Sequence, residues 1–191
     1  IIAEKGMLSP DVATVILEQV CKGMQAAHDE EILHLDLTPS NVFVKEDGTA
    51  VIMDFRSGRA IKGRAVTVKK GSEGYQAPEL LAGEGGDVRS DVYSLGAVLY
   101  TMVTCKVPMG AFSRISELNS SARRFDSLVS RSLRATPDER PQSVEDFAAT
   151  LVASGEEVVL PEREDDLEGW LEVLSYQPDH EQAMEALQAE I

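Results

Sequence analysis

The sequence is poor in cysteine and in long apolar runs, and both shortages exclude classes of protein. Its two cysteines, Cys21 and Cys105, lie in apolar helical patterns, so we expect buried free thiols rather than a disulfide or a metal pair. Free thiols are typical of a reducing compartment, and we therefore expect a cytoplasmic protein. No stretch reaches the roughly 18 consecutive apolar residues of a membrane helix, and the start lacks a signal-peptide pattern. The sequence therefore predicts no membrane segment in this chain.

Positive charge is also scarce, because 33 Asp and Glu face only 18 Lys and Arg, a formal net charge of −15. The excess lies mostly in residues 156–191, which hold 12 acidic residues and one Arg. A negative chain is repelled by phosphate backbones, so we expect no nucleic-acid partner. We interpret the acidic end as a solvated helical face or, alternatively, as a docking site for a basic protein partner.

The 191 residues can bury one sizeable core, and the first residue, Ile1, leads us to expect a piece of a longer polypeptide. Apolar residues recur at helical spacing in four segments, which predicts helices at about 10–28, 89–104, 123–134 and after Ser143. Ser9 and Ser143 are good N-caps for the first and last of them. We expect the last helix to turn Phe147, Leu151 and Val152 inward.

A tight β-hairpin is predicted between residues 41 and 55. Its strands are 42–44 and 51–53, and Asp47-Gly48 is a strong turn signal between them. The two ends of the hairpin bring Asn41 and Asp54 close together. Two oxygen ligands on a rigid β-ribbon suit a hard ion such as Mg²⁺, which keeps several waters and takes further oxygens from phosphate.

Short motifs follow one another along the chain in a fixed order. They are His34–Asn41, Asp54-Phe55, Ala77–Glu79, Asp91–Gly96 and Arg140-Pro141. In this order and spacing they resemble the C-terminal lobe of a eukaryotic-like (Hanks-type) serine/threonine protein kinase, especially a bacterial one, over about residues 7–153. The resemblance implies a mainly α fold, a helical bundle with a small β-hairpin at the catalytic loop, and a missing N-lobe.

The resemblance also implies a reaction, the transfer of the ATP γ-phosphate to protein Ser/Thr hydroxyls with Mg²⁺. Asp36 would orient or deprotonate the substrate hydroxyl, and Asn41 and Asp54 would ligate Mg²⁺. Phe43 would lie under the adenine, and Thr38 would face the γ-phosphate in place of the family's Lys.

Other motif positions would shape the substrate surface or hold the lobe together. By the resemblance, the substrate segment would comprise Ser72, Ala77, Pro78 and Glu79. Structural roles fall to His34, to Asp91 as a brace of the catalytic loop, and to Arg140 as the ion-pair partner of Glu79. Residues 1–155 would form the lobe. Residues 156–191 would form an acidic linker and a helical pair at about 165–176 and 180–190 that looks partly tetratricopeptide-like, a possible contact for a protein partner.

Several departures from the family pattern leave alternatives open. Leu35 replaces the Arg that receives a phosphorylated activation loop, and Arg56 replaces the Gly of the Asp-Phe-Gly motif. The sequence also has no Gly-rich loop and no strand Lys for the phosphates, so we expect this chain to be inactive alone. We therefore weigh the lobe of an active kinase against a pseudokinase scaffold. A small-molecule kinase is disfavoured by Ser72 and the Ala77–Glu79 motif.

Overall fold

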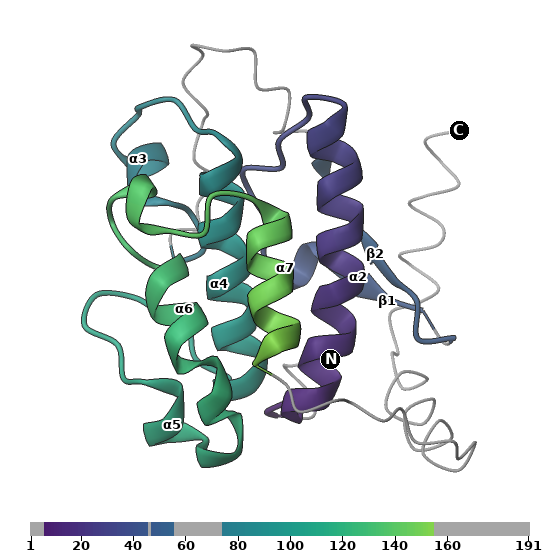
Figure 1. The fold of residues 1–191 in the computed structure, drawn as a ribbon, viewed down its shortest axis with the longest axis vertical. Helices are drawn as coiled ribbons and strands as arrows, with labels where there is room; N and C mark the ends of the chain where they lie inside the picture. Colours follow the sequence, from purple (N-terminus) through teal and green to yellow (C-terminus); the bar gives the residue numbers. More distant parts are fainter. Residues whose placement is uncertain (1–5, 46, 56–73, 155–191) are drawn as a thin grey trace.

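The computed structural model describes residues 6–45, 47–55 and 74–154, and they form a mainly helical body with one small sheet (Figure 1). This confirms the mainly α fold with a hairpin. Arg56, Ser72 and the whole 156–191 segment lie outside the described residues. None of the helices in the described ranges is long and apolar enough to cross a membrane.

Helix α2 (Pro10–Asp29) opens the described chain, as its start signals predict. The Ser9 hydroxyl accepts a hydrogen bond from the Val12 amide at 3.3 Å, and Pro10 occupies the first helical position. The predicted apolar face is buried at Ile16, Val20 and Met24. α2 lies between α7 (Val144–Ala153) and the hairpin, and it contacts both of them (Figure 1).

The hairpin joins β1 (Val42–Val44) to β2 (Ala50–Ile52) in antiparallel register, with Val42 opposite Ile52. Gly48 turns the chain with a φ of +78°, a left-handed conformation that suits glycine, and its amide donates to the Lys45 carbonyl at 3.0 Å. The hairpin is the predicted one, although β2 begins and ends one residue earlier. It rests on α2 through Gln19, which bonds Gly48 and Ala50.

Helix α4 (Val88–Thr104) is the central element, and almost all of its residues are buried. Its N-cap is Asp87, which forms a capping box with Ser90. Gly96 lets α6 (Asp126–Ser132) approach, because a Cβ built there would lie 2.5 Å from the Ser132 Cβ. α4 therefore sits at the middle of a core that α2, α6 and α7 surround.

The connecting segments are short helical turns. They are η1 (Pro39–Asn41), α3 (Pro78–Leu81), α5 (Ile115–Leu118), η3 (Ser120–Phe125) and η4 (Pro137–Glu139). One predicted boundary is wrong here. The helix predicted at 123–134 is a 3₁₀ turn that ends at Phe125, followed by α6.

Two burial predictions are also wrong. Both cysteines are free, and burial raises the pKa of the Cys21 thiol to about 12, but Cys105 is exposed. Cys105 is the C-cap residue just past the end of α4. Its left-handed φ of +54° takes its side chain off the apolar face of the helix. Val152 is 51% exposed although Leu151 beside it is fully buried, because one step along α7 turns it about 100° from the face that Phe147 and Leu151 bury.

Candidate active site

The candidate catalytic loop, residues 34–41, leads from α2 to the hairpin, and hydrogen bonds attach it to α4. The Asp91 carboxylate accepts hydrogen bonds from the backbone amides of His34 at 2.9 Å and Leu35 at 2.7 Å. The same carboxylate meets His28 Nε2 at 2.8 Å, and Asp91 is fully buried. A buried carboxylate needs such donors, so Asp91 both satisfies its own charge and braces the loop.

The His34 side chain connects the loop to the segment after β2. Its Nδ1 accepts a hydrogen bond from the Asp36 amide at 3.3 Å. Nε2 therefore carries the ring proton and donates it to the Met53 carbonyl at 3.0 Å. The imidazole also packs against Phe55, with ring centroids 4.7 Å apart. His34 thus fixes the residues on both sides of Asp54 relative to Asp36.

Asp36 and Asn41 are locked together inside the loop. Asp36 is 4% exposed, and its carbonyl accepts a hydrogen bond from Asn41 Nδ2 at 2.8 Å. Because the amide nitrogen of Asn41 is engaged there, its Oδ1 is the end that a cation would use. Thr38 precedes η1, and its carbonyl accepts the Asn41 amide at 3.0 Å.

Asp54 follows β2 in a left-handed backbone conformation, with a φ of +63°. The neighbouring Met53 amide donates to the Asn41 carbonyl at 2.8 Å, so the two predicted cation ligands lie at adjacent ends of the hairpin. A non-glycine residue at positive φ is strained, which is common where a side chain is aimed for function. Phe43 lies in β1 opposite Val51 and is half-buried.

The donor set fits a magnesium ion that is mainly bound through its substrate. No group of three or more His, Cys, Asp or Glu side chains forms a metal centre within the described ranges. One amide oxygen and one carboxylate are nevertheless the hard ligands that Mg²⁺ accepts when phosphate and water complete its shell. Asn41 and Asp54 are therefore suited to hold Mg²⁺ only together with a phosphate ligand.

The segment from Tyr75 to Glu79 is anchored to α4 at several points. Ser94 Oγ donates to the Tyr75 carbonyl at 2.8 Å, and Ala77 is the N-cap of α3. Glu79 and Arg140 form the expected ion pair, in which both guanidinium nitrogens lie 2.8 Å from a carboxylate oxygen. The segment is therefore a rigid surface beside the catalytic loop.

Arg140 is buried, and its charge is fully paired. Besides Glu79 it donates to the carbonyls of Arg134, Ala135 and Arg89 at 2.8, 2.9 and 3.0 Å. Burial by itself would raise the pKa of Glu79, but hydrogen bonds from Arg140 and Ser90 outweigh it and hold that pKa below 4.5. Such a paired buried arginine is a structural element rather than a substrate group.

Leu35 occupies the position of the family's phosphate-receiving Arg, and it is buried. It forms an apolar cluster with Leu33, Ala77 and Leu80. Gly86 closes over this cluster, since a Cβ there would lie 2.7 Å from Leu80 and 3.0 Å from Leu35. The loop is therefore joined to α3 by apolar contact at the point where an Arg would offer a charge.

Three residues of the site are missed by the sequence reasoning. His28 hydrogen-bonds to the Asp91 carboxylate, and Ser94 hydrogen-bonds to the Tyr75 carbonyl. The third residue is Gln76, whose Nε2 donates to Asp36 Oδ1 at 3.3 Å. Gln76 lies 40 residues from Asp36 in the sequence, so no local pattern links the two. His28 follows the apolar stripe of α2 and is indistinguishable there from an ordinary helix-end residue.

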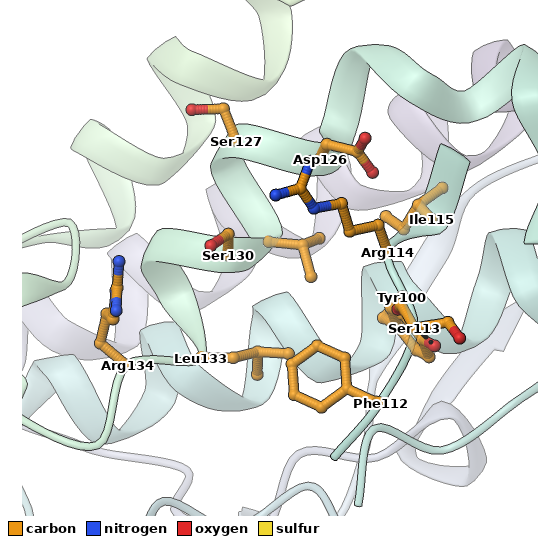
Figure 2. Close-up of a pocket in the computed structure, with 11 residues that line it drawn as sticks. Tyr100, Phe112, Ser113, Arg114, Ile115, Asp126, Ser127, Ser130, Leu133 and Arg134 are labelled. Atoms are coloured by element: carbon orange, nitrogen blue, oxygen red, sulfur yellow. Dashed lines mark hydrogen bonds between the residues drawn. The ribbon is translucent and has the colours of Figure 1, made fainter. Parts of the chain in front are cut away.

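A separate pocket of about 590 Å³ lies between α4, α5 and α6 (Figure 2). In Figure 2, Phe112 and Leu133 are drawn at the lower edge of the lining, and Arg114 and Asp126 are drawn above them. The Asp126 carboxylate is already bonded to Ser116. None of the candidate catalytic residues lines this pocket.

Comparison with known proteins agrees with this geometry. Residues 1–158 match the model of the protein kinase domain. The chain is 30% identical over 175 residues to the probable serine/threonine-protein kinase PknB of Corynebacterium glutamicum, covering 79% of this chain and 27% of that protein. It is 30% identical over 180 residues to the serine/threonine-protein kinase PknL of Mycobacterium tuberculosis, covering 85% of this chain and 45% of that protein.

The fold is that of a protein kinase domain as well. The crystal structure of the Mycobacterium tuberculosis PknI kinase domain matches with a TM-score of 0.66 at 24% identity, over 80% of this chain and 58% of that one. The chain belongs to the protein kinase domain family, and it spans less than half the length of these two curated relatives.

Proposed function

We propose that this chain is the C-terminal lobe of a serine/threonine protein kinase that transfers the ATP γ-phosphate to protein Ser/Thr hydroxyls. The observation that carries the proposal is the Asp91 carboxylate, which holds the backbone of His34 and Leu35 so that Asp36 and Asn41 stand beside the end of the hairpin. The hydrogen bonds to Asp91 order the loop that carries both residues.

Asp36 acts on the substrate hydroxyl. Its carboxylate orients that hydroxyl toward the γ-phosphorus and accepts its proton as the new P–O bond forms and the bond to ADP breaks. Asn41 and Asp54 hold Mg²⁺ when ATP is bound, and the ion neutralises charge on the phosphoryl oxygens. The rest of the catalysis is positioning, which the contacts of His34 and Asp91 supply.

Other residues bind the substrates. Phe43, on the half-buried face of β1, supports the adenine, and the Thr38 hydroxyl donates toward the γ-phosphate where the family has Lys. Ala77, Pro78 and Glu79, with Ser72, shape the surface that receives the protein substrate. The anchoring of this segment through Ser94 and Arg140 supports that role, because a rigid surface orders a peptide at low entropic cost.

The chain by itself should not turn over ATP. Its sequence has no Gly-rich loop and no strand Lys to grip the phosphates, so we propose that those groups come from an N-lobe. The Asp54→Ala variant of the isolated chain is the matched blank. An ATPase signal of the isolated chain above this blank contradicts the proposal.

A pseudokinase scaffold is the second candidate, and Leu35 is the observation that favours it. An apolar residue in place of the phosphate receiver removes one route of activation, although Asp36, Asn41 and Asp54 are all present. Residues 156–191, with their acidic excess, would serve either candidate as a contact for a protein partner, and residues 1–155 would be the lobe. We place both in the cytoplasm, because the two cysteines are free.

The intact protein that contains this chain decides between the candidates. Incubated with γ-labelled ATP, Mg²⁺ and a mixed protein substrate, it should yield phosphoserine or phosphothreonine after acid hydrolysis. Absence of label, with no nucleotide binding in Mg²⁺ or Mn²⁺, would establish the scaffold instead.

A further inference from the structure

Gln76 contacts the candidate base from a segment that lies 40 residues away in the sequence. It lies between Tyr75 and Ala77, is 1% exposed, and its Nε2 donates to Asp36 Oδ1 at 3.3 Å. The contact joins the segment that would receive a protein substrate to the carboxylate that would act on its hydroxyl. No other residue of the Tyr75–Glu79 segment has a described hydrogen bond to Asp36.

The backbone on both sides of Gln76 is fixed. Before it, the Tyr75 carbonyl accepts a hydrogen bond from Ser94 Oγ of α4 at 2.8 Å. After it, Ala77 begins α3 and is fully buried, and Glu79 is paired with Arg140. The Gln76 amide therefore extends from a rigid frame, which is the arrangement that orients a catalytic group well.

Packing alone does not account for an amide at this place. Gln76 Oε1 is buried and has no hydrogen-bond partner among the residues that the structure describes. An unpaired buried carbonyl costs free energy that a Met or Leu of similar size would avoid. The benefit that offsets this cost is the donor on the other end of the same amide, which faces Asp36.

We infer that Gln76 is a positioning residue that holds the Asp36 carboxylate for phosphoryl transfer. The inference rests on the proposed function and adds a coupling to it, because Gln76 reaches Asp36 only while the substrate segment is seated on α4. A displaced segment carries its amide away from Asp36, and the reaction slows even while ATP stays bound.

The first test compares two identical chemical changes in the intact protein. Gln76→Met keeps the volume and removes the donor, and kcat should fall about 10- to 100-fold while KM for ATP stays within about twofold. Gln25→Met is the matched control, because Gln25 also donates to a carboxylate, Asp29 at 2.8 Å, and also has a buried unpaired Oε1. Its kcat should not change. An active wild type with equal kcat in both variants would overturn the inference.

The second test does not need turnover. In a ¹⁵N-labelled sample, the NMR signals of the Gln76 side-chain NH₂ group are assigned by their loss in Gln76→Met. Their chemical shifts should change in the Asp36→Asn variant. They should not change in the control variant Asp138→Asn. Unchanged signals in Asp36→Asn would show that the two groups do not touch, and would overturn the inference even in an active enzyme. If the wild type transfers no phosphate, the proposed function fails, and these signals still decide whether Gln76 holds Asp36.

Discussion

Leu35 shows how one side chain changes the way a catalytic loop is held. It sits at a φ of +60°, a conformation that strains any residue with a Cβ, and its side chain is buried against Ala77 and Leu80. An Arg at this point would direct a charge toward the activation segment. Leu35 instead fixes the loop to α3 permanently, so we expect phosphorylation of the activation segment to have little effect on this site.

Truncating Leu35 should therefore destabilise the fold. Leu35→Ala removes a fully buried side chain from a small cluster, and we expect the free energy of unfolding to drop by about 2–5 kcal/mol. Urea denaturation of the variant and the wild type measures this free energy of unfolding. Leu81→Ala, a similar truncation on α3 at a side chain that is 48% exposed, should cost much less. An equal loss of unfolding free energy in the two variants would show that apolar packing of Leu35 does not hold the loop.

The Glu79–Arg140 pair makes a prediction that depends on pH. Glu79→Gln leaves the buried Arg140 without its counter-charge and should cost roughly 3–5 kcal/mol at pH 7. Because the folded pKa of Glu79 is lowered below its usual 4.5, the contribution is complete above about pH 5 and disappears as pH falls through the folded pKa.

Unfolding curves of wild type and Glu79→Gln between pH 7 and pH 3 should therefore converge at the acidic end. Glu84→Gln, at an exposed position, serves as the control and should match wild type near pH 7. A gap between wild type and Glu79→Gln that widens with acid would contradict the assigned sign.

At the scale of elements, the approach of α4 to α6 depends on Gly96. Gly96→Ala gains about 1 kcal/mol of helix propensity, yet its Cβ would lie 2.5 Å from the Ser132 Cβ, so we expect a net loss of about 1–3 kcal/mol. Gly23→Ala on α2 is the matched control. Its Cβ would meet only the end of the Ile52 side chain at 3.0 Å, which can move aside. Thermal unfolding should rank Gly96→Ala below Gly23→Ala, and the reverse order would be evidence against close α4–α6 packing.

The elements that could be predicted are those with local chemistry at their ends. Ser9 and Pro10 define the start of α2, Asp47-Gly48 defines the hairpin turn, and Ser143 accepts the Asp146 amide at 3.0 Å at the start of α7. Each signal acts within four residues, so the sequence alone carries it. The resemblance supplied the remaining motifs, including the Glu79–Arg140 pair.

The failures belong to features that long-range packing decides. A 3₁₀ turn and an α-helix share similar apolar spacing, so the boundary at Phe125 was not visible in the sequence. Cys105 continues the apolar pattern of α4 but lies past its end. The contact of Gln76 with Asp36 depends on α4 bringing two distant segments together, which no short pattern encodes.

At the scale of the whole molecule, one buried helix organises the candidate site. α4 supplies Asp91 to the catalytic loop, Ser94 to the substrate segment and Gly96 to the packing of α6. The candidate base and the candidate cation ligands thus lie on a single rigid support. This arrangement agrees with membership in the protein kinase domain family.

The most direct measurement of the central claim is the initial rate of phosphate transfer by the intact protein and its Asp36→Asn variant. General-base catalysis contributes about 10²- to 10⁴-fold, so the variant should lose that factor while it remains folded by circular dichroism. Asp138→Asn, at an exposed acid, should keep the wild-type rate. An Asp36→Asn variant that transfers phosphate within about threefold of wild type would contradict the role assigned to Asp36.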